Sequence, residues 1–220
     1  MGEILRKKQL SYLVRPSSRE SSPPLLILLH GARSNEEWMF DFADLLPEEF
    51  LVVSVRGPIQ YGLKSFAWFE LDESEESIAN EQKLKDSIEQ ILSFIDEIIE
   101  KYQADPQRVI LLGFSQGGIS SYNIALTHPE KIKAIVVLGG RMLREIKPLA
   151  VHPKRIQQVK MFIGHGLQDR RLVFEKALEA ADYLRSQGVN FEMHAYNDDH
   201  TINGEMIWDV NNWLAGIIND

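Results

Sequence analysis

The 220-residue chain is 44% hydrophobic and 25% charged, proportions typical of a soluble globular protein, and its length suits a single domain, residues 1–220, with one sizeable core. Its net charge of −8 argues against nucleic acid as a partner, because phosphates repel an acidic surface. The lack of cysteine excludes disulfides and thiolate metal sites. No apolar run is long enough for a secretory signal or a membrane span, so we expect a cytoplasmic protein without stable membrane insertion.

Short aliphatic runs alternate along the chain with longer amphipathic segments, and the short runs predict strands. Several are apolar on consecutive residues, which indicates parallel strands covered on both faces. The first two runs are joined by the turn-rich segment SSRESSPP, which is too short for a helical crossover, so we expect an antiparallel N-terminal hairpin. The predicted strands are residues 10–14, 25–29, 51–55, 109–112, 134–138, 160–163 and 191–196.

Four amphipathic segments with helical spacing of their apolar residues lie between or after these strands. The first ends at Pro47, the second near Pro106 and the third at Gly188. This alternation of strands and helices predicts a three-layer α/β sandwich with a mostly parallel sheet. Residues 141–158 fit neither period and are expected to form a surface loop or a short cap element. The apolar stripes of the four helices fall within residues 38–46, 84–102, 173–184 and 206–217.

A serine stands at a predicted strand-to-helix turn. The aliphatic run 109–112 leads directly into GFSQGG, in which the serine is Ser115, and a helix-like segment follows to Leu126. This is the G-x-S-x-G pattern in the context that it requires, because the tight turn leaves no room for side chains at the glycines and lifts the hydroxyl clear of the sheet. The alternative is a glycine-rich turn with an incidental serine, but its place at the exit of a buried strand favours a nucleophile.

Further motifs accompany GFSQGG along the chain. LLHGARSNEEW precedes it, AWFELDE lies between the two, and IGHGLQD and DDH follow. Together they resemble the phospholipase/carboxylesterase family of α/β-hydrolases, which includes acyl-protein thioesterases. The resemblance extends from about Leu25 to Leu214 and implies an α/β-hydrolase core with a minimal lid, acting on carboxyl esters or thioesters.

A serine hydroxyl needs a base to take its proton, and in α/β-hydrolases the acid and then the histidine follow the serine along the chain. Of the six histidines, His200 alone lies in a polar loop between the last strand and the last helix, so we predict it as the base. Asp169 lies in the loop after the penultimate strand, and the resemblance makes it the acid that orients the imidazole. The alternative for Asp169 is an N-cap of the helix that follows.

One residue departs from the family pattern. The family usually has glycine directly before the base, where this chain has Asp199. A side chain there could tilt the loop, and its carboxylate would favour the charged form of His200. With His194 and Asp198 these two residues could also be metal ligands, but no paired histidine motif elsewhere supports that reading, and we expect no metal.

The oxyanion of a tetrahedral intermediate needs two preorganised N–H donors. The residue directly after the serine, Gln116, is predicted to supply one backbone N–H, and the loop at residues 30–33 should supply the other. The resemblance narrows the second donor to the residue that follows His-Gly, which is Ala32.

The resemblance also suggests three substrate-binding residues. Trp68 and Phe69 could line a pocket, although aromatic residues are as often ordinary core, and Leu167 is expected near the acyl chain. A basic group in the irregular segment is either a solvated loop or a contact for an anionic head group. It consists of Arg141, Arg144, Lys147, Lys154 and Arg155.

We therefore predict a serine hydrolase that cleaves carboxylic esters through an acyl-enzyme, without metal or organic cofactor. Only residues 57–72 and 141–158 remain to build a lid, which predicts an open groove and a preference for short-to-medium acyl esters. The alternative within enzymes is a lysophospholipase or an acyl-protein thioesterase, and the alternative outside them is a non-catalytic binding module. The expected partner is a small-molecule ester or thioester, and the oligomeric state stays open.

Overall fold

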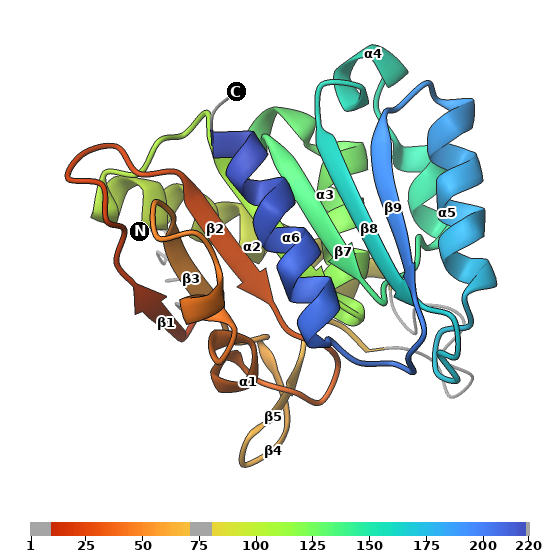
Figure 1. Ribbon diagram of the computed structural model, residues 1–220, viewed down its shortest axis with the longest axis horizontal. Coiled ribbons are helices and arrows are strands. Elements are labelled where there is room, and N and C mark those ends of the chain that lie inside the picture. The colour runs from red at the N-terminus through yellow and green to blue at the C-terminus, as the bar shows by residue number, and fades with distance from the viewer. Residues whose placement is uncertain (1–9, 71–80, 219–220) are drawn as a thin grey trace, which may run out of the picture.

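The computed structural model of the chain describes residues 10–70 and 81–218. Seven strands form one sheet in the order β1-β3-β2-β6-β7-β8-β9, and every neighbouring pair from β3 to β9 is parallel (Figure 1). The runs that are apolar on consecutive residues form the buried interior of this sheet, as expected of parallel strands. The strands are β1 (Tyr12–Arg15), β2 (Leu25–Leu29), β3 (Leu51–Val55), β6 (Val109–Phe114), β7 (Ala134–Leu138), β8 (Lys160–Gly166) and β9 (Phe191–Tyr196).

Helices cover both faces of the sheet, which confirms the predicted α/β-hydrolase sandwich. Alternate residues of β2 enter two core clusters: Leu26 and Leu28 pack with α1 and α6, and the other three pack with α2, α3 and α5. In Figure 1, α6 lies in front of the sheet and α2 and α3 lie behind it. The helices are α1 (Glu36–Phe40), α2 (Glu81–Tyr102), α3 (Gln116–Thr127), α4 (Pro153–Ile156), α5 (Glu175–Ser186) and α6 (Gly204–Ile218).

The N-terminal strand is antiparallel as expected, but the predicted hairpin with the second strand is wrong. β1 pairs with β3, so that Arg15 lies opposite Val52. β2 is fully buried and has β3 and β6 as parallel neighbours, so both of its edges are occupied. β1 is half-buried, which suits the edge of a sheet, and the Arg15 guanidinium fixes it there by donating to three carbonyls in the segment before β3.

The two segments left to build a lid contain short regular elements, and residues 141–158 were expected to form a surface loop or a short cap element. A hairpin of β4 (Ile59–Gly62) and β5 (Ser65–Ala67) lies within residues 57–70, and the rest of the predicted segment 57–72 falls outside the described residues. Residues 141–158 contain the 3-10 helix η3 (Arg144–Leu149) and the single-turn helix α4. Each element is too short to establish a hydrophobic period of its own.

The helix predicted over residues 38–46 is also shorter than expected. It ends at Phe40 and is followed by a separate 3-10 turn, η1 (Ala43–Leu45). A second 3-10 turn, η2 (Pro129–Lys131), precedes β7. In residues 10–70 and 81–218 no helix has the length and apolar character needed to cross a membrane.

The parallel strands bring distant parts of the sequence together. The parallel strands all run in the same direction, so their carboxyl ends lie on the same side of the sheet. The loops after β2, β6, β7, β8 and β9 meet on that side, which is at the bottom of Figure 1. The residues predicted to carry out chemistry lie in these loops.

Candidate active site

Ser115 lies in the sharp turn between β6 and α3 with a positive φ, at φ 51° and ψ −112°, a backbone conformation that residues with side chains rarely adopt. Packing requires the glycines on both sides. A Cβ atom at Gly117 would lie 2.0 Å from the carbonyl oxygen of Leu29, and a Cβ atom at Gly113 would lie 2.3 Å from the Gly117 carbonyl. The spacing of G-x-S-x-G is therefore a steric requirement of this turn.

Ser115, His200 and Asp169 come together in one chain of hydrogen bonds. Nε2 of His200 lies 2.9 Å from the Ser115 Oγ, and Nδ1 of His200 lies 2.7 Å from Oδ2 of Asp169. Because an ionised carboxylate only accepts, Nδ1 carries the proton and Nε2 can accept the proton of the hydroxyl. The side chain of His200 is 11% exposed and that of Asp169 is 0% exposed. The series of hydrogen bonds therefore runs from the interior to a surface that a substrate can reach.

Asp169 is held ionised by its hydrogen bonds. Burial favours the neutral acid, but hydrogen bonds from His165, His200 and the Leu172 N–H outweigh it and keep the pKa of this carboxyl well below its usual value. Oδ1 accepts from the N–H groups of Arg171 and Leu172, at 2.9 and 2.7 Å. Asp169 thus caps a local turn, but not the helix as the alternative reading had it, because α5 begins only at Glu175.

His165 contacts the carboxylate of Asp169 from inside the core. Its side chain is fully buried, and Nε2 lies 2.6 Å from the carbonyl oxygen of Leu172 and 3.2 Å from Oδ2 of Asp169. The ring packs edge-on against Phe174, with 6.0 Å between the ring centroids. His165 therefore contacts the carboxylate, whereas His200 bridges the carboxylate and the serine.

Asp199, the residue that departs from the family pattern, ties the acid loop to the base loop. Its Oδ1 accepts from the backbone N–H groups of Arg170 and His200, at 2.9 and 2.8 Å. Its Oδ2 accepts from Nε of Arg170 at 2.7 Å and from Nη2 of the same guanidinium. These bonds, first the one from the Arg170 N–H, lower the pKa of Asp199 to about 2. The carboxylate faces Arg170 and contacts His200 through the backbone only, so we name this contact the Asp199–Arg170 clamp.

Sequence reasoning did not foresee the Asp199–Arg170 clamp, although a signal for it was present. An acidic residue directly before the predicted base and a basic residue directly after the predicted acid lie in two loops that the fold brings together. Opposite charges at those two places indicate a contact across the site.

The two predicted oxyanion donors lie at the serine. Ala32, Ser115 and Gln116 line one cavity of about 40 Å³. Within residues 10–70 and 81–218, neither the Ala32 N–H nor the Gln116 N–H has a hydrogen-bond acceptor. The Gln116 side chain turns into the core, where it accepts from the Trp68 N–H at 2.8 Å and donates to the Phe69 carbonyl at 2.7 Å. Two N–H groups are thus available beside the hydroxyl.

His30, which sequence reasoning set aside, positions the loop of Ala32. Its ring is fully buried; Nδ1 donates to the Gly31 carbonyl at 2.7 Å, and Nε2 accepts from the Gly57 N–H at 2.9 Å. Burial lowers the pKa of His30 to about 4, so the ring is neutral near pH 7. The Trp68 Nε1–H donates to the His30 carbonyl at 2.8 Å, which fixes the same loop from the other side.

The predicted substrate-binding residues do not line this cavity. Trp68 and Phe69 belong to the core cluster behind the sheet and are 0% and 1% exposed, so neither offers a surface to a substrate. Their assignment to a pocket is corrected to core, because both side chains are buried in the cluster that also contains apolar residues of α2 and α3. Leu167 is half-exposed on the surface of the loop after β8.

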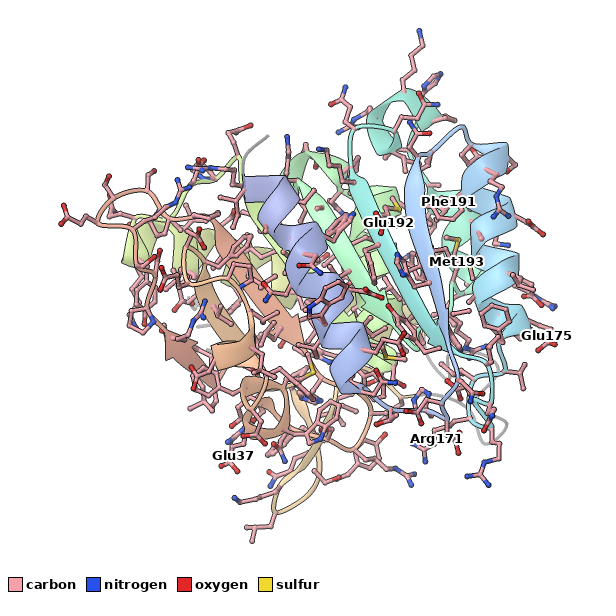
Figure 2. The ribbon with its side chains drawn as sticks, viewed as in Figure 1. Glu37, Arg171, Glu175, Phe191, Glu192 and Met193 are labelled. Atoms are coloured by element: carbon pink, nitrogen blue, oxygen red, sulfur yellow. The ribbon has the colours of Figure 1, made fainter. Side chains whose placement is uncertain are left out.

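Three arginines line the cavity instead. Arg33 follows Ala32, Arg141 lies in the loop after β7, and Arg171 lies in the loop after β8. Figure 2 shows Arg171 at the edge of the molecule where β8 and β9 end. Ile119 and Leu172 supply the apolar part of the lining. Arg141 was part of the basic group noted in the sequence; the other two were not singled out.

The metal-ligand interpretation of the residues around His200 has no support in the geometry. His194 contacts Glu192 at 2.6 Å and Asp209 at 3.1 Å, away from the serine. Asp198 accepts from the Asn203 side chain at 3.0 Å. In the part of the chain that the structure describes, no group of three or more histidine, aspartate or glutamate side chains could hold a metal ion.

Comparisons with known proteins find relatives along nearly the whole chain. A family model described as Phospholipase/Carboxylesterase matches residues 12–218. The chain is 24% identical over 185 residues to carboxylesterase SOBER1 of Arabidopsis thaliana, covering 82% of this chain and 77% of that protein. It is 24% identical over 230 residues to acyl-protein thioesterase 1 of Mycosarcoma maydis, covering 94% and 96%. The solved structure of a carboxylesterase from Mesorhizobium loti shares the fold, with a TM-score of 0.83 at 20% identity over 97% of this chain and 98% of that chain.

Proposed function

The chain belongs to the phospholipase/carboxylesterase family and is a carboxylic ester hydrolase, and on this premise we propose that it is a serine esterase that works through an acyl-enzyme intermediate. The observation that carries the proposal is the hydrogen-bond chain from the Ser115 Oγ through the His200 ring to Asp169. The proposal takes residues 1–220 as one catalytic domain.

In the first half of the reaction, the Ser115 Oγ attacks the ester carbonyl while Nε2 of His200 takes the hydroxyl proton. The electron pair of the C=O bond moves to the oxygen, and the backbone N–H groups of Ala32 and Gln116 stabilise the oxyanion. When the C=O bond re-forms, the alcohol leaves with the proton from His200; a thioester would release a thiol in the same step.

In the second half, a water molecule attacks the acyl group on Ser115 and gives its proton to His200. The intermediate collapses, the serine oxygen takes the proton back, and the carboxylic acid leaves. Asp169 holds the imidazole in the tautomer with Nδ1–H and stabilises the imidazolium that forms in both halves. Its lowered pKa favours this role, because an ionised carboxylate is present throughout.

We propose short-to-medium acyl esters as the preferred substrates. The cavity at Ser115 holds only about 40 Å³, and residues 57–70 and 141–158 carry only short elements above the core. A larger cavity of about 390 Å³ lies between α2, α3 and η3, and Ser115 is not among its lining residues. Each further methylene adds about 0.8 kcal/mol only where it is buried.

The chain-length preference is tested with monomeric para-nitrophenyl esters from acetate upward. We expect kcat/KM to rise over the first few carbons and then to level off. A steady rise through the longest soluble chains, with acetate nearly inert, would show a deep acyl tunnel and would overturn the preference.

The serine mechanism is tested by Ser115→Ala together with labelling by a fluorophosphonate. The variant should keep the thermal stability of the wild type, lose labelling and lose about 10⁴-fold or more in kcat. Esterase activity within a few-fold of wild type in the purified variant would contradict the mechanism. A wild-type protein that is not labelled would favour the non-catalytic binding module. Thioesters and lysophospholipids in the same panel separate the two enzymatic alternatives.

A further inference from the structure

The cavity at Ser115 is unusually basic for such an acidic chain. The chain has 32 acidic and 24 basic residues, yet among the residues that the structure describes, eight line this cavity, of which three are arginines and none is acidic. They come from three separate loops, after β2, β7 and β8. The arginines are therefore brought together by the fold, and they are not neighbours in the sequence.

The guanidinium groups of Arg33 and Arg171 are not used up in ion pairs. Within the ranges 10–70 and 81–218 neither has a carboxylate within 4.0 Å, and the Arg33 guanidinium lies over the ring of Tyr61 at 5.5 Å from its centroid. The carboxylates of the neighbouring loops are engaged elsewhere: Asp169 contacts His200, and Asp199 contacts Arg170. Both arginines are exposed and can rearrange around a ligand.

Arg141 brings a third positive charge to the cavity from a buried position, at 7% exposure. Guanidinium groups bind carboxylate and phosphate oxygens in paired, charge-assisted hydrogen bonds. Positive charge gathered in a small concave site also concentrates anions there, even when the net charge of the protein is negative. Because Ser115 lines the same cavity of about 40 Å³, an anion held here would lie close to the reacting carbonyl.

We propose that the preferred substrate is an ester that carries an oxyanionic group, a carboxylate or a phosphate, close to the scissile carbonyl, and that Arg33, Arg141 and Arg171 bind this group. The proposal rests on the proposed serine esterase function and names its substrate class. It requires no further reagent, because the anion only binds and the bonds that form and break are those of ester hydrolysis.

The experiment compares esters that differ in charge but hardly in shape. para-Acetoxybenzoate is paired with para-acetoxybenzamide, which places the charge on the alcohol side. The para-nitrophenyl monoester of adipic acid is paired with para-nitrophenyl hexanoate, which places it on the acyl side. para-Acetoxyphenyl phosphate tests phosphate in place of carboxylate. We expect kcat/KM to be higher for the anionic member of at least one pair by about tenfold at low ionic strength, and the ratio to shrink as sodium chloride is added.

Variants then connect this ratio to the arginines. Arg33→Gln and Arg171→Gln should each lower the ratio of anionic to neutral kcat/KM by roughly two- to fivefold, and the double variant should lower it further. Arg141→Gln should lower the ratio as well and Arg141→Lys should restore part of it, with thermal melting to check that both fold. Arg19→Gln is the matched control, because Arg19 is exposed before β2 at the opposite edge of the sheet and the charge change is the same.

Two outcomes overturn the inference: equal kcat/KM for the charged and neutral members of every pair, or a ratio that Arg33→Gln, Arg171→Gln and Arg19→Gln all leave unchanged. The failure of the proposed function looks different. If no ester in the panel is hydrolysed in a Ser115-dependent manner, the serine esterase proposal fails. If the neutral esters are hydrolysed but the charged ones are not preferred, only the substrate class is wrong.

Discussion

The nucleophile side of the site, formed by the loops after β2 and β6, is held by backbone packing, whereas the acid–base side, formed by the loops after β8 and β9, is held by side-chain charges. On the first side, Gly117 lies against the Leu29 carbonyl and the neutral ring of His30 joins two backbone segments. On the second side, Asp169 and Asp199 together accept hydrogen bonds from both loops. Backbone packing tolerates almost no change in side-chain size. The charged hydrogen bonds tolerate a change in side-chain shape but not the loss of a charge.

The largest effect is expected from adding a methyl group on the nucleophile side. Gly117→Ala would place Cβ 2.0 Å from a backbone oxygen that cannot move without distorting β2. We expect a loss of more than about 3 kcal/mol in the free energy of unfolding, and loss of activity in any folded fraction. Urea unfolding measures the first quantity.

Gly216→Ala is the matched control for this change. Gly216 lies in α6, and a Cβ atom there would meet nothing within 4 Å, so alanine should stabilise the helix by about 0.5–1 kcal/mol. If Gly117→Ala proved as stable as the wild type, the steric account of the turn would be wrong.

The next largest effect separates the two histidines of the acid–base side. His200→Ala should lower kcat by about 10⁴-fold and remove the initial burst of product, because among the described residues His200 is the base that contacts the Ser115 hydroxyl. His165→Ala should retain measurable turnover, since His165 contacts the acid and His200 is the histidine hydrogen-bonded to Ser115. A reversed order of the two variants would mean that the base is misassigned.

A third effect concerns the stability that the buried ring on the nucleophile side confers. The pKa of His30 is lowered from 6.5 to about 4 by burial, so between these values the unfolded chain binds a proton that the folded protein does not. Stability should therefore be fully present above pH 6.5 and fall by about 3 kcal/mol as the pH is lowered to 4.

Urea unfolding at several pH values tests this window. His30→Gln, which cannot titrate, should show a shallower loss of stability between pH 6.5 and 4 than the wild type. His152→Gln is the control, because His152 is exposed. Parallel curves for the wild type and His30→Gln would show that His30 is not kept neutral by the fold.

The smallest effect is expected from the Asp199–Arg170 clamp. Asp199→Asn removes the charge but keeps the shape, and the resulting shift between the two loops should lower kcat by about three- to thirtyfold with little change in KM. Since the pKa of Asp199 is about 2, the clamp persists over the whole pH range in which the enzyme is assayed.

A double-mutant cycle sharpens this test. If the two residues act as one contact, Arg170→Gln should add little to the effect of Asp199→Asn. Asp182→Asn is the control, because it breaks an exposed pair with Arg185 on α5. An Asp199→Asn variant with wild-type kcat would show that the clamp does not position the base.

The same contrast explains how much could be predicted from the sequence. The buried strands and the turn at Ser115 depend on neighbours a few residues apart, so consecutive aliphatic residues and glycine spacing predicted them. The fold then brings Asp169 and His200 to that turn from two later loops, in the expected chain order of serine, acid and histidine.

The errors concern contacts between distant segments. The predicted hairpin of β1 with β2 does not form, because β3, which comes later in the chain, lies beside β2. β1 pairs with β3 instead. Trp68 and Phe69 directly follow the short strand β5, and the local sequence does not tell whether their side chains point into a pocket or into the core. They were therefore assigned to a pocket, although they are buried. The Asp199–Arg170 clamp and the three arginines of the cavity likewise depend on loops that only the folded sheet brings together.

The backbone angles of Ser115 have a consequence for how this protein can change over time. A side chain at positive φ costs on the order of 1–3 kcal/mol, and glycine at the same place would avoid most of that cost. The native fold is therefore less stable than a version without its nucleophile could be. Selection for stability alone would drift toward an inert protein, so only selection for the hydroxyl itself keeps a serine at this turn.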